Sequence, residues 1–104
     1  MKCSHKREKQ GIVIRFCGEL GHHEAAQCVE YLEKTMILYA NDPIILDLSG
    51  LTFMDSSGIA VALHTLQQMK QLGGKMRIAN SPVQVKKVFA AAGIQKMIGM
   101  EDVT

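Results

Sequence analysis

Short apolar runs alternate with longer stretches of helical periodicity along this chain, and that order constrains its fold more than any other feature. PIILDLS (residues 43–49) is rich in apolar residues, which is typical of a strand covered on both faces. KMRIAN (residues 75–80) is a second candidate strand. Between them, the apolar residues from Ile59 to Met69 recur at steps of three and four and predict a helix. Because parallel strands need long crossovers, this order predicts an α/β fold with a largely parallel sheet.

The N-terminal part of the chain is predicted to add a hairpin and another helix. IVIRFC (residues 12–17) has the composition of a strand, and the polar segment before Gly11 is expected to pair with it. Residues 22–40 show helical spacing until Pro43 and the polar residues before it end the pattern.

The C-terminal part predicts a third helix. Ser81 and Pro82 give it a cap and a first-turn proline, and Gly93 ends it. A last short strand is expected near residues 97–99. We assign residues 1–104 to one domain, because 104 residues is a usual size for a single core.

Composition limits the classes of function. A formal net charge of +2 without a concentrated basic stripe argues against direct nucleic-acid binding. No apolar run approaches a membrane span, and the polar start MKCSHKREKQ lacks the apolar segment of a secretory signal. The three cysteines are widely spaced and form no C-x-x-C pair, and no P-loop is present. We therefore expect a soluble cytoplasmic protein with no metal and no cofactor of its own.

The stretch LTFMDSSGIAVAL (residues 51–63) holds two serines where an apolar run gives way to helical spacing. The first interpretation is capping, since Asp55 and a serine are preferred residues at helix starts. It leaves Gly58 unexplained, because glycine costs about 1 kcal/mol relative to alanine inside a helix. We infer that something comes close to the backbone at this glycine.

The second interpretation makes Ser56 or Ser57 a nucleophile assisted by His22, His23 or His64. The motif G-x-S-x-G and a glycine-rich oxyanion loop are both absent, which disfavours a hydrolase. The third interpretation is reversible phosphorylation. A dianion at a helix N-terminus is held locally by free N–H groups, yet it repels a partner surface beside Asp55.

Three segments resemble one known family: GELGHHEAA (residues 18–26), IILDLSGLTFMDSSGIAV (residues 44–61) and QLGGKMRIANSPVQVKKVFAAAGI (residues 71–94). In order and spacing they are similar to the STAS-domain anti-sigma factor antagonists of bacteria, most closely the sporulation type. The resemblance implies a hairpin and mixed sheet packed with helices. It also implies that the phosphate acceptor is Ser56 and that Ser57 supports the turn.

The resemblance further implies partner switching by a protein that is a kinase substrate and not an enzyme. The unphosphorylated form would bind an anti-sigma factor that is also an ATP-using serine kinase, and so release the sigma factor. Phosphorylation of Ser56 would end binding, and a metal-dependent phosphatase of the PP2C type would reset the cycle. The alternative is a STAS module that acts as a scaffold, or binds a nucleotide or lipid, without a kinase cycle.

The interface predicted for the partner is the turn and the exposed part of the following helix. Its members are Asp55, Ser57, Gly58 and whichever of Ile59 and Val61 faces solvent, together with His22 and His23. One position departs from the family, because Gly21 stands where an aspartate is common. Glycine still permits a helix start, but a carboxylate expected near the switch serine is missing there.

Overall fold

The computed structural model describes residues 1–101. The described residues form six strands, three α-helices and one short 3₁₀ helix. In chain order these are β1 (Lys2–Glu8), β2 (Gly11–Leu20), α1 (His22–Leu38), β3 (Ile44–Asp47), β4 (Leu51–Met54), α2 (Ser57–Gln71), β5 (Met76–Ala79), α3 (Val83–Ala92), η1 (Ile94–Lys96) and β6 (Gly99–Glu101).

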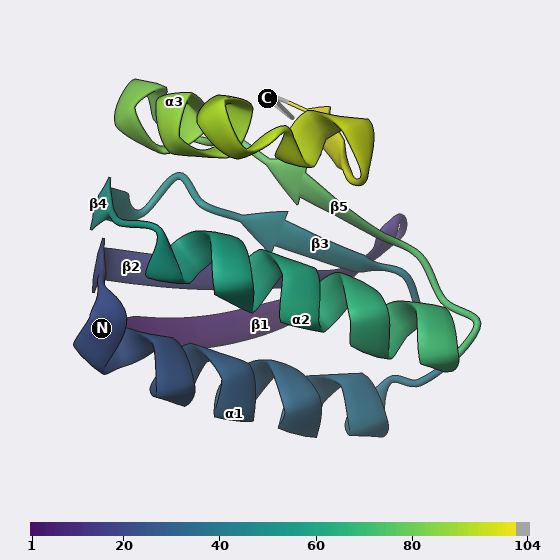
Figure 1. The fold of residues 1–104 in the computed structure, drawn as a ribbon. Coiled ribbons are helices and arrows are strands. Elements are labelled where there is room, and N and C mark those ends of the chain that lie inside the picture. The colour runs from purple at the N-terminus through teal and green to yellow at the C-terminus, as the bar shows by residue number, and fades with distance from the viewer. Residues whose placement is uncertain (102–104) are drawn as a thin grey trace.

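The strands form one mixed sheet in the order β1-β2-β3-β5-β6, with β4 attached to β2 off this path (Figure 1). β1 and β2 make an antiparallel hairpin, and all other pairs are parallel. The long strand β2 pairs with β3 along its first half and with β4 along its second half. The predicted α/β class, the N-terminal hairpin and the largely parallel sheet are confirmed.

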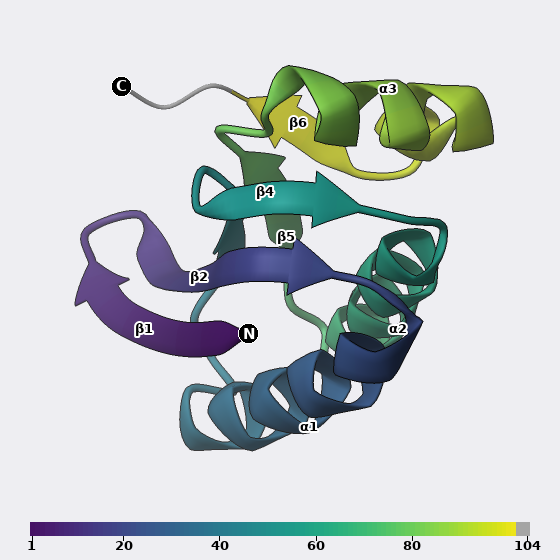
Figure 2. The same cartoon turned by 90° about the vertical axis from the view of Figure 1, so that its left-hand side faces the viewer.

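The core lies between the sheet and its helices. α1 and α2 run side by side over one face of the sheet, and α3 packs against β4 (Figure 2). Ile12 and Ile14 on β2 are fully buried, whereas the intervening Val13 is half-buried and Arg15 is exposed. Because successive strand residues point to opposite faces, the first pair faces the helices and the second pair faces away from them.

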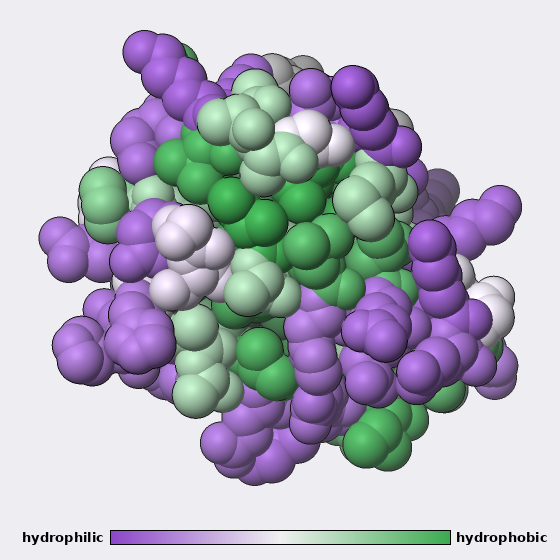
Figure 3. All heavy atoms as spheres, viewed as in Figure 1, coloured by the Kyte–Doolittle hydropathy of each residue, from purple (hydrophilic) through white to green (hydrophobic). Residues whose placement is uncertain are grey.

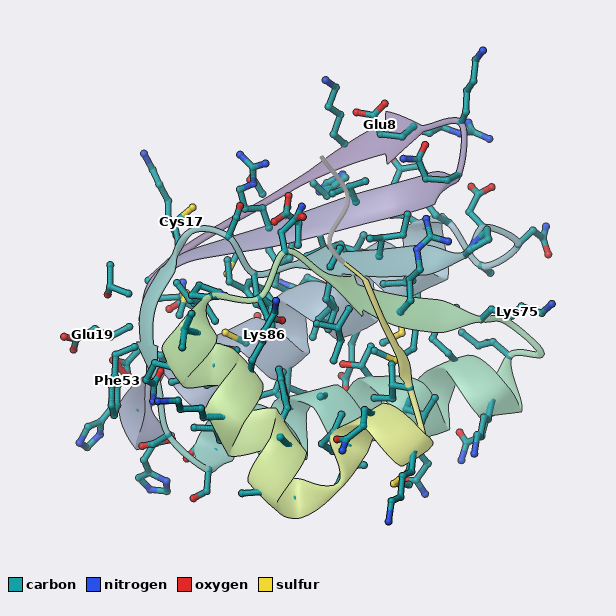
Figure 4. The ribbon with its side chains drawn as sticks, turned by 90° about the horizontal axis from the view of Figure 1, so that it is seen from above. Glu8, Cys17, Glu19, Phe53, Lys75 and Lys86 are labelled. Carbon is teal, nitrogen blue, oxygen red and sulfur yellow. The ribbon has the colours of Figure 1, made fainter. Side chains whose placement is uncertain are left out.

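Strand β4 and the short helix η1 are the two elements that the sequence did not predict. The four residues of β4 are buried, exposed, exposed and buried, so the alternation that reveals a half-buried strand is absent. The pairing of β2 with β4 also shifts register between Gly18 and Glu19. Figure 4 shows Phe53 and Glu19 side by side at this end of the sheet, and the two residues are register partners.

Several predicted boundaries differ from the structure by one to three residues, and β2 continues three residues beyond its predicted end, to Leu20. α1 ends at Leu38 and not at Ala40, because Tyr39 has already left helical geometry with φ −125° and ψ 46°. Pro82 lies just before α3 as its N-cap, with an extended ψ of 161°. The last strand starts at Gly99, since the N–H groups of Met97 and Ile98 still bond to the carbonyl of Ile94. The predicted end of α3 at Gly93 is confirmed, with φ 73° in the left-handed region.

Candidate functional site

The turn between β4 and α2 leaves one serine hydroxyl uncommitted. Ser56 is the N-cap residue of α2, it is exposed, and its side chain makes no capping hydrogen bond. Capping comes from Asp55, whose Oδ1 accepts a 2.8 Å hydrogen bond from the Ser57 N–H. The capping interpretation therefore applies to Asp55, and the hydroxyl of Ser56 is left for another role.

The carboxylate of Asp55 links the starts of two helices. The pKa of Asp55 lies below its ordinary value, chiefly because of the hydrogen bond from the Ser57 N–H, and the backbone N–H of His22 at the start of α1 lowers it further. A helix N-terminus carries a partial positive charge, and here two such termini meet one carboxylate. The turn is thus built to hold a negative charge beside Ser56.

Gly21 lies next to this carboxylate. It is the N-cap residue of α1, which forms as expected although glycine offers no capping side chain. A Cβ atom at residue 21 would stand 3.4 Å from Oδ2 of Asp55. Gly21 brings no carboxylate of its own, and Asp55 supplies one at the start of α1.

The three histidines near the turn differ in their surroundings. His22 and His23 are exposed, and their rings meet edge to face with centroids 5.7 Å apart. His22 is the one that reaches Asp55, through its backbone. His64 Nε2 lies 2.8 Å from Oε1 of Glu33 on α1. Among residues 1–101 no side-chain hydrogen bond joins any of these rings to Ser56 or Ser57.

Two residues predicted to face a partner are in the core. Gly58 is buried, and a Cβ there would stand 2.2 Å from Sδ of Met54. The group that comes close to this glycine is therefore the side chain of Met54 from β4, and not a partner. Val61 is 2% exposed and belongs to the core cluster. The proposed contact surface must exclude the side chain of Val61, and Gly58 lies against Met54 beneath it.

Ile59 remains the apolar residue of this turn that reaches the surface. It is half-buried and starts a line along α2 with Leu63 and Leu66, at steps of four and three residues. Val88 on α3 is half-buried against the same core. Figure 3 shows apolar side chains gathered on this face between α2 and α3. The turn of residues 54–58 therefore borders an apolar surface.

A cavity of about 630 Å³ lies on the opposite face of the sheet, away from α1 and α2. Its lining includes Arg15 and Asp47, whose Nη2 and Oδ2 are 2.9 Å apart. Burial alone would raise the pKa of Asp47, but the Ser49 N–H and the Arg15 pair lower it below its ordinary value. Lys6, Glu8 and Asn80 also line this cavity. It forms a second polar site on the face of the sheet away from the helices, distinct from the turn of residues 54–58.

A contact that no sequence pattern indicated also holds the turn, from α3. The side chain of Gln84 on α3 makes two hydrogen bonds to the backbone of Met54, the residue before Asp55. The two residues are 30 positions apart, and a glutamine in the first turn of a helix carries no sequence signal for such a contact.

The mixed sheet, its helices and the Asp-Ser-Ser-Gly turn together define a STAS domain. The STAS domain family model matches residues 4–104, and the chain belongs to this family. Among characterised relatives, it is 31% identical to the anti-sigma F factor antagonist of Lysinibacillus sphaericus over 86 residues. That match covers 83% of this chain and 74% of the relative.

Solved structures of the anti-sigma factor antagonist SpoIIAA, in its unphosphorylated and its phosphorylated form, are both similar to the structure of this chain. The unphosphorylated form matches with a TM-score of 0.82 and 29% identity, covering 99% of this chain and 89% of that chain. The phosphorylated form of the Bacillus protein matches with a TM-score of 0.74 and 28% identity, covering 99% and 92%. The predicted resemblance to the sporulation type of antagonist is confirmed.

Proposed function

We propose that this protein is an anti-sigma factor antagonist of the SpoIIAA type that acts by partner switching. Its unphosphorylated form binds an anti-sigma factor that is also a serine kinase, and the sigma factor is released. The kinase phosphorylates Ser56, and the complex then dissociates. A phosphatase of the PP2C type removes the phosphate from Ser56 and restores binding.

The observation that carries this proposal is the uncommitted hydroxyl of Ser56. Asp55 caps the helix start, so esterifying Ser56 removes no hydrogen bond that the fold uses. The similarity to solved SpoIIAA in unphosphorylated and phosphorylated forms supports the same residue chemistry here.

Charge explains how the modification changes binding and spares the fold. A phosphoserine carries a charge near −2 and three acceptor oxygens, which the N-terminus of α2 accommodates. The same charge stands beside the ionised Asp55 at the edge of the apolar α2 surface. A docked partner would have to desolvate both anions together, which opposes binding.

The docking surface that we propose consists of Asp55, Ser57 and the α2 line of Ile59, Leu63 and Leu66. His22 and His23 border it from α1, because Asp55 connects the two helix starts. A small apolar patch beside polar groups is the composition expected of a transient protein contact. Gly58 and Val61 act from below this surface by shaping the turn and not by touching the partner.

The remaining parts of the cycle belong to the partners. In this proposal the kinase supplies ATP and its magnesium ion, and this protein supplies the hydroxyl. Among residues 1–101 no helix has both the length and the apolar character needed to cross a membrane. We place the protein in the cytoplasm, where the proposed kinase and sigma factor act, with no direct contact to nucleic acid.

Variants at Ser56 test this function. Ser56→Ala is expected to bind a kinase-type anti-sigma factor in the presence of ATP without dissociating. Ser56→Asp is expected to bind at least about tenfold more weakly, because two like charges at a desolvated contact reduce the binding free energy by about 1.4 kcal/mol or more. Calorimetric titration gives the affinities, and intact-mass analysis detects the added phosphate. Ser4→Asp is the control, because Ser4 is another exposed serine and lies on β1, outside the turn and the proposed docking surface. Equal affinity of Ser56→Ala and Ser56→Asp would refute the switch.

The cavity on the other face of the sheet favours one alternative function. A STAS module that binds a nucleotide or lipid would use such a site, and Lys6 and Arg15 in its lining suit a phosphate group. Titration with ATP, GTP and anionic lipid vesicles distinguishes the two functions. Binding that is lost in Lys6→Ala, combined with no phosphate gain at Ser56 under any kinase-type partner, would favour the alternative.

A further inference from the structure

Gln84 holds the end of strand β4 through both atoms of its side-chain amide. Its Oε1 accepts a 3.0 Å hydrogen bond from the Met54 N–H, and its Nε2 donates a 2.8 Å hydrogen bond to the Met54 carbonyl. Gln84 is the second residue of α3, so these bonds tie the first turn of that helix to the residue before Asp55.

The two bonds replace a neighbouring strand. Within residues 1–101, β4 pairs with β2 alone, so the other edge of β4 has no strand beside it. Met54 is 0% exposed, and buried backbone groups without partners are costly. The amide of Gln84 offers one acceptor and one donor side by side, as a strand neighbour would.

Met54 in turn supports the switch. Its side chain fills the space under Gly58, where an added Cβ would meet Sδ at 2.2 Å and Cγ at 2.4 Å. Its backbone leads directly into Asp55, whose carbonyl accepts a hydrogen bond from the Gly58 N–H at 3.1 Å. A displacement of Met54 therefore moves both sides of the turn that carries Ser56.

We propose that Gln84 is the positioning residue of the switch: by holding the backbone of Met54, it fixes the orientation in which Ser56 is presented to the kinase. The functional part of this inference rests on the proposed phosphorylation of Ser56. The same contact couples α3 to the turn, so a displacement of either one shifts the position of the other.

Amide hydrogen exchange, measured by NMR on the whole protein without any partner, tests the positioning directly. Gln84→Met keeps the length of the side chain and removes both bonds. It is expected to lower the protection of the Met54, Ser57 and Gly58 amides about tenfold, equivalent to about 1.4 kcal/mol, while amides of β3 stay within about twofold. The pKa of Asp55 should rise, because the Ser57 N–H is held less firmly. Gln67→Met, at an exposed position of α2, is the control and should change neither quantity.

Gln84→Glu provides a rescue within one variant. Above the pKa of the introduced carboxyl, one of its oxygens faces the Met54 carbonyl and repels it, so protection of the turn falls. Below that pKa the carboxyl donates an O–H to the same carbonyl, and protection should return to within about threefold of the parent protein at the same pH. Failure to recover on acidification would overturn the assignment of these two bonds as the holding contact.

The remaining outcomes separate this inference from the proposed function. Unchanged protection of the turn in Gln84→Met, or an equal loss throughout the sheet, would show that Gln84 does not position the switch. With a kinase that phosphorylates the parent protein, Gln84→Met should be phosphorylated about tenfold more slowly, because fewer turn conformations present the hydroxyl. An equal rate would refute the positioning role. Absence of phosphorylation in the parent protein itself refutes the proposed function and leaves the exchange results standing.

Discussion

Gly58→Ala is expected to have two opposing effects on stability, one from helix propensity and one from packing against Met54 under the switch turn. Alanine is favoured over glycine in a helix by about 1 kcal/mol, so propensity alone predicts a more stable protein. The structure places the new Cβ 2.2 Å from Sδ, 2.4 Å from Cγ and 3.2 Å from Cε of Met54. Met54 is 0% exposed, so its side chain has to move within a close-packed core. Such overpacking costs about 1–3 kcal/mol, and we expect a net destabilisation of about 1 kcal/mol.

Urea unfolding followed by far-ultraviolet circular dichroism measures this change, since the chain has no tryptophan. With a slope of about 1 kcal/mol per molar urea, the midpoint should fall by about 1 M. Ala60→Gly is the control for propensity at an exposed position two residues further along α2, and it should cost about 1 kcal/mol.

Repeating Gly58→Ala in a Met54→Ala protein decides whether the contact with Met54 causes the destabilisation. Met54→Ala removes the clashing atoms, so adding Gly58→Ala to it should stabilise the protein by about 1 kcal/mol. Because Met54→Ala alone is expected to cost about 2–5 kcal/mol, both variants are compared in sodium sulfate, which strengthens burial. Stabilisation by Gly58→Ala in the parent protein would refute the packing explanation.

Two further predictions concern charges near the site and on the opposite face. Gly21→Asp would place a carboxylate within reach of Asp55 Oδ2, which lies 3.4 Å from the Cβ position. The pKa of Asp55, measured by ¹³C NMR titration, should therefore be higher than in the parent protein. Gly21→Asn controls for capping, and a pKa of Asp55 that is unchanged or lowered in Gly21→Asp contradicts the geometry. The pKa of Asp47 is lowered in the folded state, so its contribution to stability is present above the ordinary carboxyl pKa of about 3.9 and is lost as the pH falls through the folded value. The stability difference between the parent and Asp47→Asn, from urea unfolding, should therefore shrink on acidification, and a difference that stays constant from neutral to acidic pH would contradict the assignment.

The main elements of the fold are predictable because their signals are local. Helical spacing predicts α1, α2 and α3, and Gly93 marks a helix end through its own backbone preference. Short runs rich in apolar residues between turn residues predict β2, β3 and β5, although β2 extends beyond its run. Strand β4 could not be predicted in this way, because its burial depends on the elements packed above and below it and its sequence shows no apolar–polar alternation.

The candidate site divides in the same way. The motif itself indicates Asp55 as a cap and Ser56 as the acceptor. The motif could not tell that Gly58 and Val61 are buried and that Ile59 reaches the surface, because a residue near the start of a helix faces solvent or core according to the angle at which the preceding strand arrives.

The sequence alone determined the alternation of strands and helices and the chemistry of the turn, since both depend on residues within a few positions of one another. Only the tertiary structure decided what surrounds that turn. Gln84 reaches Met54 across 30 residues, and the start of α1 shares the carboxylate of Asp55. Such contacts form when packing brings distant backbone groups together, and their partners are chosen by distance and direction in the folded chain.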